Sequence, residues 1–192
     1  MTTNGLSMKH SLPTLETQRL KIRPITFEDA PSIFAYAKNP NVSRFTLWEP
    51  HQSLKDSETF IKEYVFPNYL NLIPEPFAVT FKENITHVIG TVGCFWVDKS
   101  SHSMELAYSY GEEYWGKGIA CEAGKAILKY CFENLNAIRI QARCKKENTA
   151  SAKVMQKLGM RFEGTLRSSL FHRGKHWDME YYSILKSEFS KI

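Results

Sequence analysis

The chain has 192 residues and a mass of 22.2 kDa, a length for one domain that leaves no room for two independent catalytic domains. Hydrophobic residues make up 43% of it and charged residues 23%, which excludes an intrinsically disordered or low-complexity chain. The 25 basic and 20 acidic side chains leave a net charge of +5, far short of a nucleic-acid-binding tail but suited to an anionic ligand.

The four cysteines, at positions 94, 121, 131 and 144, lie far apart and form no C-x-x-C pair. This spacing argues against a structural zinc site or a disulfide framework, so we expect reduced thiols. The first thirty residues lack the features of a secretory signal, and no apolar run approaches the roughly 18 residues that span a bilayer. We therefore expect a cytoplasmic protein, with a flexible leader over residues 1–12 and a single domain over residues 13–192.

The first elements in chain order are a strand and two helices. Polar and apolar residues alternate over residues 19–23, which predicts a short half-buried strand. Thr26 stands three residues before Asp29, a capping pattern that opens a helix through residue 37. A second helix is expected over residues 54–69, where apolar side chains recur at spacings of three and four.

Three strands are predicted next. Residues 76–81, 87–97 and 103–110 are rich in Val, Ile, Thr and aromatic side chains and are separated by short polar segments. This pattern is typical of a three-stranded antiparallel meander. Gly90 and Gly93 lie inside the middle strand, where a glycine marks either a close packing contact or a bulge.

The second half alternates helices and strands. A helix is predicted over residues 118–134, a strand over 138–144, a helix from Asn148 to Leu158, and two facing strands over 161–171 and 177–185. The complete order is βααβββαβαββ, without an internal repeat or a low-complexity linker. This order predicts one mixed α/β (α+β) domain.

A glycine-rich segment joins the third meander strand to the long helix. Gly116 and Gly118 flank Lys117 just before the helix begins. Unshielded backbone N–H groups at a helix N-terminus bind phosphate, and the lysine adds a positive charge. The alternative is a plain glycine turn. A dinucleotide-binding fingerprint is disfavoured because Cys121 stands where its third glycine would fall, and a Walker loop is absent.

Several segments together resemble the GNAT superfamily of N-acetyltransferases, and most of all its RimJ/RimL branch. They are Glu-Leu-Ala-Tyr-Ser-Tyr (105–110) with Tyr-Trp-Gly-Lys-Gly-Ile-Ala-Cys-Glu-Ala (114–123), the helix 148–160 and the strand 17–23. They occur in the family's order and cover residues 14 to about 186. The resemblance implies a mixed, mostly antiparallel sheet of about seven strands flanked by about four helices.

The resemblance also implies acetyl-CoA as cosubstrate, with no metal. Main-chain groups of Ala107, Tyr108 and Ser109 would pair with pantetheine, unless that strand pairs on both sides. The pyrophosphate would lie on the loop formed by Trp115, Gly116, Lys117, Gly118, Ile119 and Ala120, where Trp115 departs from the family's Gln or Arg. Asn148 would hold the pantetheine arm or simply cap its helix. Lys157 would approach the phosphates or lie in solvent.

The catalytic roles implied by the resemblance fall on Glu105 and Ser151. Glu105 would accept the amine proton, although a solvated strand face is the alternative. Glu122 is a weaker rival that fits a structural hydrogen-bonding role better. Ser151 would protonate the leaving thiolate, because Met155 stands where many family members carry a tyrosine.

The acceptor site is less constrained by the sequence. In this family the region between the first two helices helps to form it, so Trp48 and Glu49 are predicted to contact substrate, with core packing as the alternative for Trp48. The cation-rich segment 171–177 is interpreted as a solvated turn rather than a metal site, because no Cys or carboxylate stands at ligand spacing.

The resulting hypothesis is an enzyme that transfers acetyl from acetyl-CoA to a primary amine by direct attack in a ternary complex, with the N-terminal amine of a ribosomal protein as the acceptor. Acetylation of a small amine, such as a polyamine or an antibiotic, is the first alternative. A catalytically silent CoA-binding sensor is the second. No membrane or direct nucleic-acid partner is expected, and a homodimer is a family-level expectation.

Overall fold

The computed structural model describes residues 12–189, and these residues build one eight-stranded sheet in the order β1-β2-β3-β4-β5-β6-β8-β7. All neighbouring strands are antiparallel except β5 and β6. The strands are β1 (Leu15–Glu16), β2 (Leu20–Pro24), β3 (Phe77–Phe81), β4 (Gly90–Asp98), β5 (Ser103–Tyr110), β6 (Arg139–Lys145), β7 (Arg161–His172) and β8 (Lys175–Leu185).

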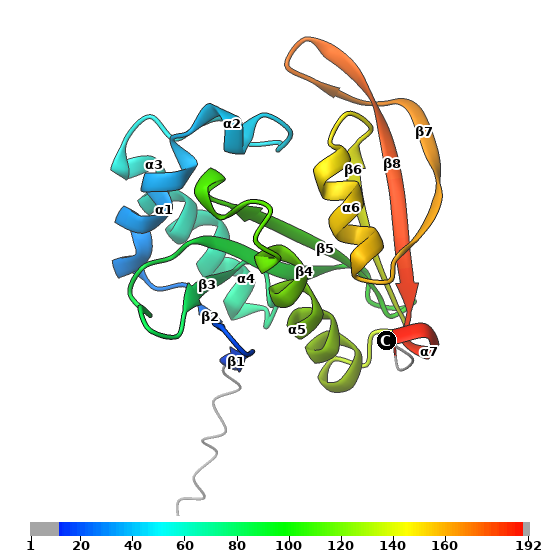
Figure 1. Cartoon of the computed structure of the whole chain (residues 1–192), viewed down its shortest axis with the longest axis horizontal. Coiled ribbons are helices and arrows are strands. Elements are labelled where there is room, and N and C mark those ends of the chain that lie inside the picture. Colours follow the sequence, from blue (N-terminus) through cyan, green and yellow to red (C-terminus); the bar gives the residue numbers. More distant parts are fainter. Residues whose placement is uncertain (1–11, 190–192) are drawn as a thin grey trace, which may run out of the picture.

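Helices cover both faces of the sheet (Figure 1). One face carries α5 (Ile119–Asn134) and α6 (Thr149–Lys157). The other carries α1 (Ala30–Ala37), preceded by a 3-10 turn (Phe27–Asp29), and a segment made of α3 (Leu54–Phe60), a π-helical turn (Ile61–Val65) and α4 (Phe66–Leu70). The short helices α2 (Pro40–Ser43) and α7 (Lys186–Phe189) and a 3-10 turn (Glu112–Tyr114) complete the set.

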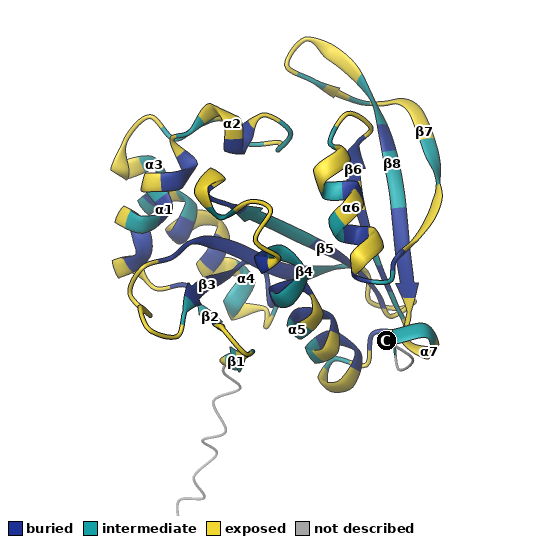
Figure 2. Ribbon diagram, viewed as in Figure 1, coloured by how far each residue is buried: buried dark blue, intermediate teal, exposed yellow. Residues whose placement is uncertain are grey.

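Each face has its own hydrophobic core. The larger core lies under α5 and α6 and includes Met104 and Leu106 of β5. The smaller core lies under α1 and the π-helical turn and includes Ala78 of β3. Figure 2 shows the buried central strands between these layers, with β7 exposed along most of its length. Because side chains alternate along a strand, Glu105, which lies between Met104 and Leu106, projects toward the α1–α4 face.

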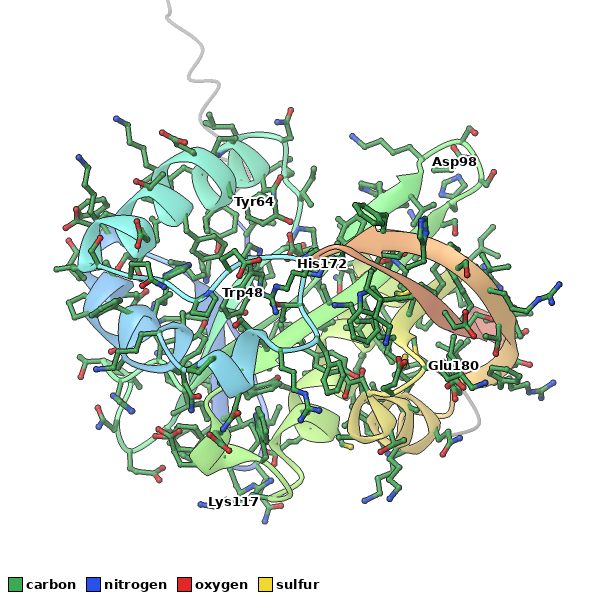
Figure 3. The ribbon with its side chains drawn as sticks, turned by 90° about the horizontal axis from the view of Figure 1, so that it is seen from above. Trp48, Tyr64, Asp98, Lys117, His172 and Glu180 are labelled. Atoms are coloured by element: carbon green, nitrogen blue, oxygen red, sulfur yellow. The ribbon has the colours of Figure 1, made fainter. Side chains whose placement is uncertain are left out.

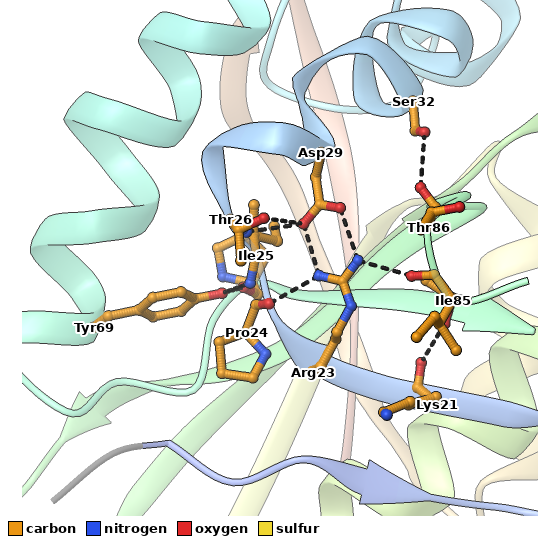
Figure 4. A network of polar contacts seen from close by, with 12 residues as sticks. Lys21, Arg23, Pro24, Ile25, Thr26, Asp29, Ser32, Tyr69, Ile85 and Thr86 are labelled. Carbon is orange, nitrogen blue, oxygen red and sulfur yellow. Dashed lines mark hydrogen bonds and ion pairs between the residues drawn. The ribbon is translucent and has the colours of Figure 1, made fainter. Parts of the chain in front are cut away.

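A polar network anchors α1 to β2 (Figure 4). The Arg23 guanidinium donates to both carboxylate oxygens of Asp29, at 2.7 and 2.8 Å, and Asp29 also accepts from the Thr26 backbone N–H at 2.8 Å. The hydrogen bond to Asp29 raises the pKa of Arg23 against the opposing effect of burial. The Thr26–Asp29 capping pattern expected from the sequence is therefore confirmed, and Asp29 also forms an ion pair with Arg23.

The predicted element order is confirmed, with small differences. The two-residue β1 and the one-turn helix α2 were not expected, and β1 makes the sheet eight-stranded rather than seven-stranded. Pro67 lies within the second predicted helix and does not end it, since the helical segment continues through α4 to Leu70. Of the expected leader, residues 1–11 lie outside the described residues, whereas Leu12 packs against the larger core.

The two glycines of β4 are packing positions. A Cβ on Gly90 would lie 2.3 Å from the Tyr110 ring, and one on Gly93 would lie 2.4 Å from the Pro74 carbonyl oxygen. The register shift between β4 and β5 falls instead between Trp96 and Asp98. Close backbone approach, not a bulge, therefore explains why glycine stands at both positions.

Candidate active site

The strands β5 and β6 separate after a short parallel ladder. Within the described residues this ladder ends at Glu105 and Gln141, while β5 stays paired with β4 up to Tyr110. The edge of β5 that faces β6 is thus unpaired over residues 106–110, which excludes the alternative that this strand pairs on both sides. Residues 107–109 are half-buried there. A free strand edge offers main-chain groups to an extended ligand.

The glycine loop follows the free edge and leads into the 16-residue helix α5. Gly116 and Gly118 have φ angles of 73° and 76°, in the left-handed region that favours glycine. In the described chain no acceptor takes the backbone N–H groups of residues 116–118. Arg19 fixes the loop, since it donates to the Lys117 carbonyl at 3.2 Å and to the Glu122 carboxylate at 2.7 Å. Free N–H groups at the N-terminus of a helix are an arrangement that suits an anion.

The other loop residues contribute in different ways. Trp115 donates from Nε1 to the Tyr110 carbonyl at 2.8 Å, so its ring holds the end of β5. The Ile119 side chain is buried in the core and Ala120 is half-buried, which leaves only their backbone N–H groups facing the loop. The Lys117 side chain is exposed, with its ammonium 5.9 Å from the Tyr114 ring centre.

Helix α6 places a hydroxyl pair beside the free edge. The Ser151 and Tyr108 hydroxyl oxygens are 2.8 Å apart, and Asn148 caps α6 by accepting from the Ser151 backbone N–H at 3.2 Å. Met155 is fully buried. Burial raises the pKa of the Cys121 thiol in the first turn of α5, and the ammonium groups of Lys157 and Lys125 oppose that rise.

Glu122 has the structural role. Its carboxylate accepts from the Thr17 hydroxyl at 2.6 Å and from the Arg19 backbone N–H at 2.9 Å, besides its ion pair with the Arg19 guanidinium. Burial opposes these contacts, but their net effect lowers the pKa of Glu122. The β2 segment is thereby tied to the start of α5.

Glu105, the predicted proton acceptor, is buried, and each of its carboxylate oxygens accepts a hydrogen bond. Its Oε1 accepts from Arg143 Nε at 2.9 Å and its Oε2 accepts from Gln141 Nε2 at 2.8 Å. Arg143 and Gln141 both lie on β6, across the point where the strands separate. The carboxylate therefore bridges the two strands on the α1–α4 face rather than lying on a solvated face.

A second carboxylate on the same face was missed by the sequence analysis. Glu75 is 7% exposed, and its Oε2 accepts from the Tyr64 hydroxyl at 2.6 Å and from Asn68 Nδ2 at 3.3 Å. Burial raises the pKa of Glu75 to about 7, against the opposing hydrogen bond from Tyr64. No motif marks this residue, and only its folded position beside Gly93 reveals it.

An aromatic row leads from the loop after α2 to Glu75. Its ring centres are 5.7 Å apart for Trp48 and His51, 6.3 Å for His51 and Phe60, and 5.7 Å for Phe60 and Tyr64. Figure 3 shows Trp48 and Tyr64 on the half of the molecule that carries the α3–α4 segment, and Lys117 at a separate edge.

The β7–β8 hairpin is not the simple solvated turn that the sequence predicted. Its tip residue Arg173 donates to the Glu49 carboxylate at 2.8 Å and to the Trp48 carbonyl at 3.0 Å. The tip therefore closes over the loop after α2, a contact between residues 124 positions apart that no local pattern reveals. Trp48 packs in part against the smaller core, and Glu49 is already paired.

A lysine and aromatic side chains lie directly behind the tip of this hairpin. Lys145 is 1% exposed, with Nζ 3.1 Å from His172 Nδ1 and 4.4 Å from the centre of the Trp177 ring. Burial lowers the pKa of Lys145. Over residues 12–189 no group of three or more His, Cys, Asp or Glu side chains could hold a metal ion. Across the same range no helix is long and apolar enough to cross a membrane.

Comparison with known proteins agrees with this geometry. Residues 19–161 match the family described as "Acetyltransferase (GNAT) domain". The chain belongs to the GNAT family of N-acetyltransferases. The uncharacterized N-acetyltransferase p20 of Bacillus licheniformis is 33% identical over 181 residues, which cover 93% of this chain and 99% of that protein. The N-acetyltransferase activity and the use of acetyl-CoA follow from this membership.

Other GNAT proteins share the fold and differ in their acceptors. The crystal structure of a GNAT-family acetyltransferase from Bacillus anthracis superimposes with a TM-score of 0.82 at 28% identity, over 92% of this chain and all of that one. RimL, described as a ribosomal L7/L12 α-N-protein acetyltransferase in complex with coenzyme A, has the same fold at 15% identity and a TM-score of 0.80, over 90% and 98%. The spermidine N(1)-acetyltransferase of Escherichia coli (strain K12) is 25% identical over 82% of this chain and 81% of its own.

Proposed function

We propose that this N-acetyltransferase moves the acetyl group directly from acetyl-CoA to a primary amine in a ternary complex. The observation that carries this proposal is the separation of β5 from β6 beside the Tyr108–Ser151 hydroxyl pair. The gap gives the thioester a free strand edge, and the α1–α4 face gives the amine a route to its carbonyl carbon. No covalent enzyme intermediate is needed, because both reactants reach the same gap.

The roles follow from position. Backbone groups of residues 107–109 orient the pantetheine arm, and the N–H groups of residues 116–120 hold the pyrophosphate, with Lys117 and Lys157 as nearby cations. Asn148 keeps α6 in register and faces the arm. Ser151, hydrogen-bonded to Tyr108, gives its proton to the CoA sulfur as the C–S bond breaks. Two carboxylates, Glu105 and Glu75, face the amine side.

For the acceptor we propose the N-terminal amine of a protein, of the ribosomal kind. The acceptor side carries Arg143, Lys145 and Arg173, and its acids Glu105 and Glu49 are already paired with two of these. Within the described residues only Glu75 lacks a cationic partner there. A polyamine needs a carboxylate for each ammonium, whereas a peptide needs one for its terminus and hydrogen bonds for its carbonyls.

The decisive test is a screen of ribosomal-protein N-terminal peptides, polyamines and aminoglycosides for acetyl-CoA-dependent thiol release. We expect turnover with a peptide and weaker turnover with polyamines. A polyamine acetylated with a higher kcat/KM would overturn the proposed acceptor. Binding of acetyl-CoA in calorimetry without turnover of any amine would instead identify a silent sensor.

The Ser151→Ala variant tests the leaving-group role. We expect kcat to fall about 100-fold, the lower range for loss of a positioned acid, while the Kd of acetyl-CoA changes little. Thr149→Ala, at an exposed position in the first turn of the same helix, is the matched control. An unchanged kcat in Ser151→Ala would assign the proton donation to water.

A further inference from the structure

We propose that Glu75 accepts the proton of the attacking amine and that the Tyr64 hydroxyl links its carboxylate to solvent. This inference rests on the proposed direct transfer and deepens it by naming the base. Glu75 stands outside every sequence motif that suggested the function, and three observations converge on it: its place, the state of its oxygens and its surroundings.

The place of Glu75 is the point where β5 becomes free. Its Cα and Cβ would lie 2.6 and 2.9 Å from a Cβ on Gly93, so the residue sits directly against that glycine. Gly93 pairs with Ala107, the first half-buried residue of the free edge, and paired residues share a face of the sheet. Glu75 therefore lies against β4, directly beside Ala107 on the strand that positions the thioester.

The oxygens of Glu75 and Glu105 differ in availability. Arg143 and Gln141 occupy one oxygen each of Glu105, and protonation of that carboxylate would leave a guanidinium without its partner. On Glu75 both hydrogen bonds end on Oε2, and in the described chain no donor contacts Oε1. Glu75 therefore has a free oxygen for an amine proton, whereas Glu105 holds β5 and β6 together as a positioning residue.

The surroundings of Glu75 suit a base at neutral pH. The groups that face Glu75 are Tyr64, Asn68 and Tyr69, all from the α3–α4 segment, and none of these is basic. Burial without a cation raises the pKa of Glu75 to about 7. A pKa near the working pH is what a group needs in order to accept a proton and release it again.

The proton balance is complete. An ammonium group loses two protons as it becomes an amide: the nitrogen bonds to the acetyl carbon, and the C–S bond breaks with its electron pair going to sulfur. One proton passes to the Glu75 carboxylate and leaves to solvent through Tyr64, a residue that is 45% exposed. Ser151 donates the proton that ends on sulfur and recovers one through Tyr108 from the reaction's second proton.

The test compares Glu75→Gln with Glu105→Gln in pH profiles of kcat/KM for the peptide amine at saturating acetyl-CoA. In the wild type the base must be ionised, so kcat/KM rises with pH through about 7. We expect Glu75→Gln to lower kcat/KM by about 100-fold or more and to abolish this limb, with an unchanged Kd for acetyl-CoA. Glu105→Gln should keep the limb. Glu63→Gln, an exposed neighbour of Tyr64, is the unchanged control.

Tyr64→Phe gives a second readout if Glu75→Gln does not fold. The Tyr64 hydrogen bond lowers the pKa of Glu75, so its loss moves the limb to higher pH, and loss of the path to solvent lowers kcat. A limb that persists in Glu75→Gln, vanishes only in Glu105→Gln, or stays in place in Tyr64→Phe would overturn the assignment of the base. A wild type that acetylates no amine would refute the proposed function itself.

Discussion

The two sides of the gap between β5 and β6 offer different kinds of groups to their ligands. On the acetyl-CoA side the expected contacts come from the backbone: a free strand edge, two glycines with positive φ and the N-terminus of α5. On the acceptor side they come from side chains that the fold collects from the α3–α4 segment, the loop after α2, β6 and the β7–β8 hairpin. A backbone site tolerates many sequences, whereas a side-chain site changes with each substitution, so one cofactor can serve many acceptors.

The largest expected effect is a loss of stability that also weakens acceptor binding. Asp29→Ala removes the carboxylate from a pair whose side chains are 17% and 4% exposed, and leaves the Arg23 guanidinium without a partner. Breaking a buried pair in this way costs about 3 to 5 kcal/mol. We expect urea unfolding to show such a loss, with a raised acceptor KM because α1 loses its anchor.

This prediction has one control and two outcomes that would contradict it. The exposed Glu83→Ala should unfold like the wild type and serves as the control. An Asp29→Ala loss below about 1 kcal/mol would mean that the network in Figure 4 contributes no more than a surface pair. A weakened acetyl-CoA affinity in the same variant would show that the two sides are mechanically coupled.

A smaller effect tests the backbone side. In Gly118→Ala the φ angle of 76° costs a residue with a Cβ about 1 to 2 kcal/mol, and the loop relieves this strain by leaving its anion-binding shape. We expect the Kd of acetyl-CoA, measured by calorimetry, to rise about five- to thirtyfold. The acceptor KM should change little.

The matched control for this loop lies in the β7–β8 hairpin. Gly174 has a φ angle of 69°, and a Cβ there would meet nothing within 4 Å, so Gly174→Ala carries the same strain on the acceptor side. It should lose similar stability and keep the acetyl-CoA affinity. Equal Kd values for both variants would contradict a backbone site at residues 116–120.

The same contrast explains what the sequence could predict. Periodicity, capping and turn residues are local, so they placed the three meander strands, α5 and α6 within a few residues. β1 was missed because two residues carry no periodicity, and α2 because four residues are too few to show a helical period. The loop and the free edge are also local, since one strand, one turn and one helix start build them.

The acceptor side could not be predicted in this way. Glu75 becomes a buried carboxyl only because Gly93 admits the chain against β4, and Arg173 meets Glu49 across 124 residues. Glu105 was singled out, but the partners that occupy its oxygens lie on β6, which only the strand register brings beside it. Long-range contacts between polar side chains leave no signature in a single sequence.

The smallest expected effect concerns the contact between Arg173 and Glu49. Their side chains are 32% and 68% exposed, so a double-mutant cycle of Arg173→Ala and Glu49→Ala should give a coupling of at most about 1 kcal/mol in stability. Because the pair holds the hairpin tip over the loop that carries Trp48, we expect each variant to raise the acceptor KM a few-fold. The Kd of acetyl-CoA should stay constant, because within the described part of the chain neither side chain contacts residues 105–120. If the two substitutions show no coupling in their effects on the acceptor KM, the hairpin tip closes without this pair. The acceptor side would then extend only as far as Trp48.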